Sequence, residues 1–318
     1  MPLRCVVTGC AGFIGSHIAE ALIAQGHQVV GIDCFTDYYP RAIKLANLSA
    51  LRESPNFTLI EADLLAYDLH GLLEGADCVY HQAAQAGVRA SWGQNFRIYT
   101  ENNVLATQRL LEAARDHPLR RFVYASSSSV YGDARALPVT EETLPQPISP
   151  YGVSKLAAEH LCRLYWVNFG VPTVSLRYFT VYGPRQRPDM GFHKFIRALL
   201  TGREITLYGD GDQTRDFTFV SDAVAANLAC LEGDVAGQVF NIGGGSRISV
   251  NRVLALLESL SGEKARIRRM ENQKGDVRDT FADTSRAREL LGFRPSVTVE
   301  EGLRRELEWL SGVLSAES

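Results

Sequence analysis

The sequence lacks the cysteine and histidine spacings of a disulfide framework or a metal site. Its cysteines are scattered with no paired short spacing, at Cys5, Cys10, Cys34, Cys78, Cys162 and Cys230. Its seven histidines show no metal-ligand spacing either. We therefore expect reduced thiols, a cytoplasmic location and no bound metal.

Excess charge of one sign and long apolar runs are also missing. Lys and Arg together number 33 against 36 Asp and Glu in 318 residues, a formal net charge of −3. This near balance argues against a nucleic-acid-coating surface and against a polybasic membrane face. The apolar stretch from Cys5 to Ala24 is interrupted by His17 and Glu20, which argues against a signal peptide. We expect a soluble protein that binds neither nucleic acid nor membrane.

The first half of the chain alternates short apolar runs with helical patterns. The runs are those of strands buried on both faces: Leu3–Val7, Gln28–Ile32, Phe57–Ile60, Cys78–His81, Arg121–Tyr124 and Thr173–Leu176. Between strands, Ile14, Ile18, Ala21 and Leu22 share one helix face, and further helices are expected at Glu101–Arg115 and Tyr151–Phe169. Strand and helix in alternation predict an α/β fold with a mostly parallel sheet covered on both sides.

The pattern changes after about residue 180. Isolated strands are expected at Ile205–Tyr208, Asp216–Val220 and Val239–Ile242, and helices at Val250–Ser261 and Glu300–Leu310. We predict a large domain over residues 1–179, to which 216–242 returns. Residues 180–215 and 243–318 are then expected to form a smaller C-terminal α/β lobe on the substrate side.

A glycine-rich turn joins the first strand to the first helix. Gly9, Gly12 and Gly15 are spaced three apart, and Asp33 ends the next strand 24 residues after Gly9. Glycines at such a turn let a pyrophosphate approach the helix N-terminus, and a carboxylate after the second strand can accept both ribose hydroxyls. This arrangement predicts a Rossmann-type doubly wound domain, and the negative charge of Asp33 favours NAD over NADP.

Hydroxyl groups and a lysine follow in the same half of the chain. Tyr151 and Lys155 stand one helical turn apart, and the strand Arg121–Tyr124 runs on into four serines, Ser126 to Ser129. A phenol with a pKa of about 10 is a base at neutral pH only if its pKa is lowered, as a nearby ammonium can do. We therefore predict general acid–base chemistry at Tyr151.

Taken together, these motifs resemble the extended short-chain dehydrogenase/reductase family, in its nucleotide-sugar epimerase and dehydratase branch. The matching segments occur in order along nearly the whole chain: Thr8–Gly15, Asp63–Leu64, His81–Ala84, Asn102–Asn103, Ser126–Gly132, Tyr151 with Lys155, Arg177–Pro184, Gly209–Gly211, Arg215–Asp216 and Gly275–Val277.

The resemblance implies a role for each matching residue. Catalysis is implied for Ser127, Tyr151 and Lys155. Binding of NAD is implied for Gly9, Gly12, Phe13, Ile14, Gly15, Asp33, Asp63, Leu64, Gln82, Ala83, Ala84, Asn102, Tyr151, Lys155 and Tyr178. Binding of a UDP-sugar is implied for Ser127, Ser128, Ser129, Tyr151, Thr180, Arg185, Tyr208, Arg215 and Asp276.

The residues after Ser127 indicate the type of reaction. Sugar 4,6-dehydratases of the family carry Asp and Glu beside this position, and the related decarboxylases carry Glu, whereas this chain has Ser128 and Ser129. Serine supplies no carboxylate for eliminating water. The expected reaction is therefore oxidation and re-reduction at carbon 4 of the sugar, which is epimerisation, with Arg215 anchoring the diphosphate. The alternative for Arg215 is a surface residue paired with a neighbouring Asp.

The sugar itself is predicted from Thr180, where glucose-type 4-epimerases usually have Asn. Thr180 and the segment that follows it are more similar to UDP-glucuronate 4-epimerases. The hydroxyls of Ser128, Ser129 and Thr180 can also donate to a sugar carboxylate. Interconversion of UDP-glucose and UDP-galactose is the close alternative. Arg185 is expected to contact substrate or else to pair with Asp189.

Two further expectations concern partners and class. The helices Glu101–Arg115 and Tyr151–Phe169 carry apolar residues on more than one face, which predicts a homodimer with a four-helix interface, as in relatives. The competing explanation is deeper burial within the monomer. A protein that binds NAD without catalysis is the alternative class, although both Tyr151 and Lys155 are present.

Overall fold

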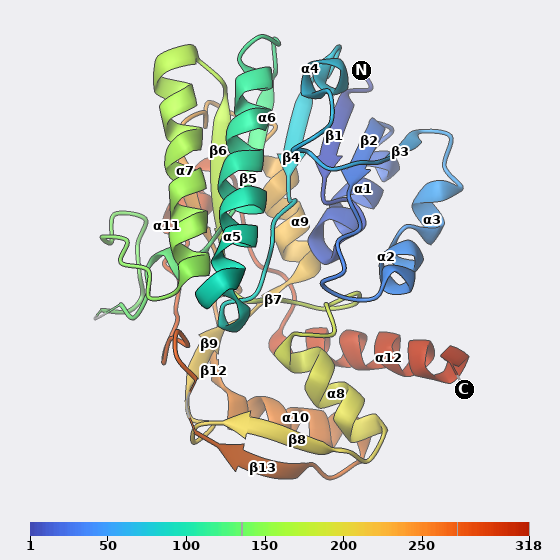
Figure 1. Ribbon diagram of the computed structural model, residues 1–318. Coiled ribbons are helices and arrows are strands. Elements are labelled where there is room, and N and C mark those ends of the chain that lie inside the picture. The colour runs from blue at the N-terminus through green and yellow to red at the C-terminus, as the bar shows by residue number, and fades with distance from the viewer. Residues whose placement is uncertain (135, 272, 318) are drawn as a thin grey trace.

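A seven-stranded parallel sheet forms the centre of the protein in a computed structural model that describes residues 1–134, 136–271 and 273–317 (Figure 1). The strand order is β11-β6-β5-β4-β1-β2-β3. The bounds are β1 Arg4–Thr8, β2 Gln28–Asp33, β3 Phe57–Glu61, β4 Cys78–His81, β5 Arg121–Ser127, β6 Thr173–Tyr178 and β11 Val239–Ile242. Chain order reverses between β1 and β4, and open sheets of this kind bind ligands outside the carboxyl ends of strands at such a point.

Helices cover both faces of this sheet and separate two apolar cores. Helix α1 (Phe13–Ala24) packs against α9 (Val220–Ala229) on one face, where Cys5 and Val7 of β1 point. Val6 points to the other face, with α4 (Leu69–Leu73), α6 (Ala106–Ala114) and α7 (Pro150–Phe169). The alternation along β1 is that of a strand buried on both sides, so the predicted doubly wound parallel fold is confirmed.

Shorter helices connect these elements on the cofactor half. They are α2 Arg41–Asn47, α3 Ser49–Arg52, α5 Phe96–Tyr99 and the short turns Arg89–Ser91, Gly93–Asn95 and Ser128–Val130. The helix expected at Glu101–Arg115 begins instead with a π-helical turn, Thr100–Leu105, before α6. Such turns often occur at functional sites, and this one carries Asn102 and the buried Asn103.

The smaller lobe lies below the carboxyl edge of the sheet (Figure 1). Strands β8 (Glu204–Tyr208) and β13 (Arg266–Met270) pair in parallel, and α8 (Gly191–Leu200), α10 (Val250–Ser261) and α12 (Val299–Glu317) pack together beside them. Three short elements, β7 (Val181–Tyr182), β9 (Thr214–Asp216) and β10 (Thr218–Phe219), connect the lobe to the sheet, with β12 (Arg247–Ser249) antiparallel to β9. Helix α11 (Ser285–Leu290) returns to β11.

The second half departs from expectation in its details. The predicted strand Asp216–Val220 is interrupted: Asp216 ends β9, Thr218 and Phe219 form β10, Val220 begins α9, and Phe217 lies between the two strands. Helices α8 and α9 and strand β13 were not predicted. All five residues of β13 are exposed, so the strand has no alternation of apolar and polar residues that a sequence pattern could reveal.

Among the residues that the structure describes, no helix has the length and apolar character to cross a membrane. Over the same ranges, no group of three or more His, Cys, Asp or Glu side chains is arranged to hold a metal ion.

Candidate active site

The glycine-rich turn folds tightly because two of its glycines leave no room for a side chain. Gly9 has a φ of +69°, and a Cβ there would lie 2.7 Å from the backbone nitrogen of Ala83. A Cβ on Gly15 would collide with the carbonyl oxygen of Gly9. Gly12 then caps α1 without a side-chain acceptor, so the first-turn N–H groups are left for a ligand. The turn, called the cradle below, has the backbone geometry that binding of a phosphate group requires.

Asp33 stands at the end of β2 beside this turn. Its carboxylate accepts backbone N–H groups from Phe35 at 2.8 Å and from Ala11 at 3.1 Å. Burial raises the pKa of Asp33, and the ammonium of Lys44 nearby lowers it. The carboxylate is therefore fixed by the backbone next to the cradle, as ribose recognition requires.

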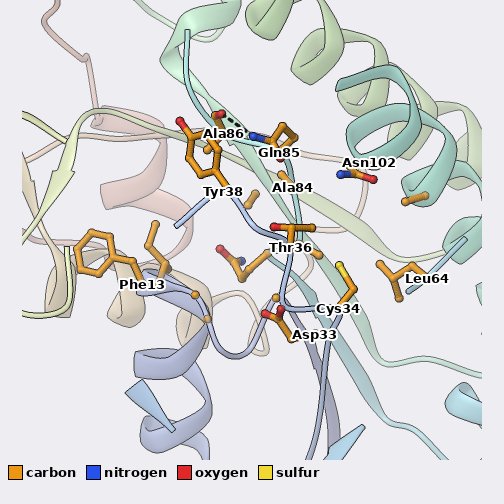
Figure 2. Close-up of a pocket in the computed structure, with 18 of the residues that line it drawn as sticks. Phe13, Asp33, Cys34, Thr36, Tyr38, Leu64, Ala84, Gln85, Ala86 and Asn102 are labelled. Carbon is orange, nitrogen blue, oxygen red and sulfur yellow. Dashed lines mark hydrogen bonds between the residues drawn. The ribbon is translucent and has the colours of Figure 1, made fainter. Parts of the chain in front are cut away.

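A cavity of about 220 Å³ extends from the cradle along the carboxyl edge of the sheet (Figure 2). Every residue predicted to bind NAD lines it: Gly9, Gly12, Phe13, Ile14, Gly15, Asp33, Asp63, Leu64, Gln82, Ala83, Ala84, Asn102, Tyr151, Lys155 and Tyr178. The glycine-rich turn, Asp33, Tyr151 and Lys155 therefore line one cavity, as binding of a dinucleotide requires. Further lining residues were not predicted, among them Cys34, Thr36, Tyr38, Lys44, Gln85, Ala86 and Arg187.

The three predicted catalytic residues meet where this cavity joins a second one. Ser127 ends β5, and its hydroxyl accepts the backbone N–H of Ser129 at 3.1 Å. Tyr151 and Lys155 lie on the first turns of α7, which begins after the N-cap Ser149. A hydrogen bond joins the Ser127 hydroxyl to the Tyr151 phenol. The structure thus brings the serine, the tyrosine and the lysine together at one place.

Burial and nearby charges set the protonation of this cluster. Burial raises the pKa of Tyr151, while the hydrogen bond from Ser127 and the positive charge of Arg187 lower it. Burial also lowers the pKa of Lys155 to about 8. The Lys155 ammonium lies 4.8 Å from the centre of the Tyr124 ring. Arg187 is thus a cation, not predicted from the sequence, whose charge lowers the pKa of Tyr151, and the predicted partner Lys155 lies over an aromatic ring.

The second cavity, of about 900 Å³, lies between the sheet edge and the smaller lobe. Most of the residues predicted to bind the sugar nucleotide line it: Ser127, Ser128, Ser129, Tyr151, Thr180, Tyr208, Arg215 and Asp276. Tyr151 and Tyr178 line both cavities. A ligand in the second cavity can therefore reach the Tyr151 phenol next to whatever the first cavity holds.

Charged side chains in the second cavity connect the cofactor half of the protein to the smaller lobe. Arg89, which was not predicted, pairs with Asp276 at 2.6 Å and lies over the Tyr208 ring at 4.3 Å. Arg215 donates to two backbone carbonyls, those of Thr214 at 2.9 Å and Arg278 at 2.7 Å. Among the described residues no carboxylate forms an ion pair with Arg215, so the alternative of a pairing with a neighbouring Asp is not found there, and Arg215 lines the cavity.

Arg185 is placed differently from either expectation. Its guanidinium pairs with Glu20 of α1 at 2.7 Å, and Arg185 is absent from the linings of both cavities. The pair with Asp189 that was one expectation for Arg185 is made by Arg187, which lines both cavities. A φ of +66° at Arg185 turns the backbone there, so that two arginines two residues apart serve different partners.

A buried polar network fixes the end of β5 from behind. Arg177 pairs with Glu159 at 2.6 Å, both almost fully buried, and Glu159 also accepts the Ser126 hydroxyl at 2.6 Å. Tyr131 accepts from Arg177 at 2.7 Å. This network holds Ser126, and with it the backbone of Ser127, relative to α7.

Comparison with known proteins places this geometry in context. The chain matches the model of the NAD dependent epimerase/dehydratase family over residues 5–243. It is 46% identical over 317 residues to a Bacillus subtilis (strain 168) protein named "Uncharacterized UDP-glucose epimerase YtcB", covering 99% of this chain and 100% of the relative. It is 38% identical over 309 residues to the UDP-glucuronate 4-epimerase of Thermodesulfobacterium geofontis (strain OPF15), covering 96% and 95% of the two chains.

A solved structure agrees closely along the whole chain. The UDP-glucuronic acid 4-epimerase from Bacillus cereus, in complex with UDP-glucuronic acid and NAD, is 44% identical with a TM-score of 0.96, covering 98% of this chain and 100% of that one.

Proposed function

Because the chain belongs to the NAD dependent epimerase/dehydratase family, we propose that it is an NAD-dependent UDP-sugar 4-epimerase whose substrate is UDP-glucuronate and whose product is UDP-galacturonate. The observation that carries this proposal is that Tyr151 lines both cavities, with Lys155 on the smaller one and Ser127 on the second, and that serines rather than carboxylates follow Ser127. Relatives named for the same reaction support it.

The smaller cavity is proposed to hold NAD. The cradle of Gly9 and Gly15 takes the pyrophosphate, Asp33 the ribose hydroxyls, and Lys155 the other ribose. NAD bound there would supply the acceptor for the hydride of carbon 4, and its reduced form would supply the hydride for the opposite face of the same carbon. Residues 1–179 with 216–242 are proposed as the NAD-binding domain, and residues 180–215 with 243–318 as the UDP-sugar lobe.

Proton transfer is the part of the reaction that the chain's own residues perform. Tyr151, as phenolate, accepts the proton of the sugar 4-hydroxyl, and Ser127 hydrogen-bonds the same oxygen. The positive charge of Arg187 and the hydrogen bond from Ser127 favour the phenolate against the cost of burial. Once the sugar ring has turned over, Tyr151 returns the proton to the same carbon-4 oxygen as the ketone is reduced on its other face.

Residues of the second cavity are proposed to hold the nucleotide while the sugar ring turns. Arg215 is the proposed diphosphate anchor, because it lines the cavity and its guanidinium donates to two backbone carbonyls rather than to a carboxylate among the described residues. Tyr208 and Asp276, held by Arg89, are proposed to bind the uridine end. An anchored diphosphate lets the sugar rotate about its linkage without leaving the site.

The uronate preference is proposed from neutral donors in the second cavity. Ser128, Ser129 and Thr180 present hydroxyls that can hold a sugar carboxylate in one orientation. If the carboxylate stays in the plane of the transient ketone, its carbon–carbon bond is misaligned for decarboxylation. UDP-glucose is the second candidate, because hydroxyl donors also suit a neutral 6-hydroxyl and the Bacillus subtilis relative is named for that sugar.

The test is to incubate the purified protein with UDP-glucuronate and, separately, with UDP-glucose, without added NAD, and to identify products by NMR. The proposal predicts UDP-galacturonate in the first reaction and faster turnover there than in the second. UDP-galactose formed faster would favour the second candidate. No product from either sugar, in protein shown to contain NAD, would favour a binding protein without catalysis.

A homodimer and a cytoplasmic location complete the proposal. Helices α5, the π-helical turn and α7 expose the apolar residues Ile98, Leu105, Val153, Leu164, Val167 and Phe169. Leu110 and Leu111 of α6 are instead fully buried inside the monomer, so only part of the apolar surface is left for a partner. A second copy packing on these helices would cover the exposed part. Six unpaired cysteines, five of them buried, support a reducing compartment.

A further inference from the structure

A strap, residues 183–190 between β7 and α8, crosses from the smaller lobe to the cofactor half. Its first part is attached to α1, the helix that begins at the glycine-rich turn. A ring nitrogen of His17 lies 3.0 Å from the carbonyl oxygen of Pro184, and Arg185 pairs with Glu20 at 2.7 Å. This end of the strap is therefore fixed outside the cavities.

The second part of the strap reaches over the cavities. The Arg187 guanidinium donates two hydrogen bonds, of 2.9 and 3.0 Å, to the Asp189 carboxylate, and the Tyr38 hydroxyl donates to the same carboxylate at 3.1 Å. Tyr38 is 151 residues away in the chain, in the loop after β2. Tyr38 and Arg187 each line both cavities, so their shared partner Asp189 joins the two halves at the junction between the cavities.

Tyr38 also spans the carboxyl end of β1. Tyr38 belongs to the loop after β2, and its side chain lies beside Gln85 and Ala86 of the loop after β4 (Figure 2). A Cβ on the adjacent Gly87 would collide with the Tyr38 hydroxyl. Strands β2 and β4 flank β1 in the sheet, so a side chain that reaches from one loop to the other passes over the strand that ends in the glycine-rich turn.

We propose that Tyr38, Asp189 and Arg187 form a latch that closes the smaller cavity over its dinucleotide and retains it between turnovers. The inference rests on the proposed function, because it requires NAD in this cavity. Asp189 is a positioning residue: it holds the Tyr38 hydroxyl and the Arg187 guanidinium at once. A dinucleotide under Tyr38 leaves by this side only after the hydrogen bond between Tyr38 and Asp189 opens. The exposure of the Arg187 and Asp189 side chains, 21% and 30%, is compatible with such opening.

The test measures release of NAD rather than catalysis. Protein loaded with radiolabelled NAD is mixed with excess unlabelled NAD, and the label remaining on the protein is followed over time on filters. Tyr38→Phe keeps the ring and removes only the hydroxyl, so it should accelerate release roughly 10- to 100-fold, the effect of losing one hydrogen bond to a charged group. Asp189→Ala should accelerate release at least as much.

A double-mutant cycle separates the latch from general loosening. In the Asp189→Ala background, Tyr38→Phe should cause no further acceleration, because both changes remove the same contact. Glu20→Gln is the matched control: it weakens the attachment of the strap to α1 outside the cavities and should leave release unchanged. Thermal unfolding and circular dichroism verify that each variant is folded.

The outcomes distinguish this proposal from the function on which it rests. Wild-type protein that binds no labelled NAD would overturn the proposed function and the latch together. Wild-type protein that binds NAD, with Tyr38→Phe releasing it at the wild-type rate, would overturn the latch alone. Equal acceleration by Glu20→Gln, or independent effects of Tyr38→Phe and Asp189→Ala, would also overturn it.

Discussion

Replacing Ser127 by alanine tests how the site makes Tyr151 basic. Burial raises the pKa of Tyr151, and the hydrogen bond from Ser127 is the largest of the interactions that lower it. A hydrogen bond to a charged group contributes about 1.5–3 kcal/mol. Its loss therefore reduces the phenolate population at a fixed pH below the pKa by roughly 10- to 100-fold.

The direction of the pH dependence follows from this loss. Ser127 stabilises the charged phenolate, so Ser127→Ala raises the pKa of Tyr151 further. In a plot of kcat/KM against pH, the limb on which activity rises with pH should move to higher pH. Activity near neutral pH should fall roughly 10- to 100-fold, and part of it should return as the pH is raised.

Ser126→Ala is the matched control one residue earlier. The Ser126 hydroxyl donates to Glu159 at 2.6 Å, behind the sheet edge. Its removal should cost stability but leave the pH limb in place. If Ser127→Ala lowers activity equally at every pH, with the limb unmoved, then Ser127 does not act through the pKa of Tyr151 and this reasoning is refuted.

Three further predictions address stability, assembly and the fate of the intermediate. Glu159→Gln leaves Arg177 buried without its carboxylate and should lower the free energy of unfolding, measured in urea, by about 3–5 kcal/mol. The same change at the exposed Glu101 should lower it by less than about 1 kcal/mol. Equal losses would contradict the argument from burial. Leu164→Glu places a charge on an exposed apolar helix surface and should yield monomers by light scattering, whereas an unchanged mass would place the dimer contact elsewhere or show that none exists. Thr180→Ala removes one of the proposed carboxylate donors and should release a UDP-pentose detectable by NMR; full epimerase activity with no pentose would count against carboxylate positioning.

The parts of the molecule that could be predicted are those whose signals are local. The first strand, the glycine-rich turn, α1 and Asp33 follow one another within 33 residues, and each constrains its neighbour through backbone contacts. The buried strands of the sheet were predicted for the same reason, since burial on both faces requires continuous apolar runs. Helix α7 carries its cap, Ser149, beside the Tyr151 and Lys155 pair that it positions.

The residues that were missed depend on how distant segments meet. Arg187 lines both cavities and Arg185 lines neither, because the backbone turns at Arg185. Sequence spacing alone does not reveal a positive φ at an arginine. Tyr38 is tied into the site by its hydrogen bond to Asp189, 151 residues away. Arg89 gains its role through Asp276, 187 residues away, and through the Tyr208 ring. Such contacts are set by tertiary packing rather than by local pattern.

The central claim is that hydrogen leaves carbon 4 of the sugar and returns to that carbon without exchanging with water. Incubating the protein with UDP-glucuronate deuterated at carbon 4, in ordinary water and without added NAD, tests this most directly. We predict UDP-galacturonate that keeps its deuterium at carbon 4 by NMR. Product carrying solvent hydrogen at carbon 4 would contradict the account, because the hydrogen would then have been lost as a proton.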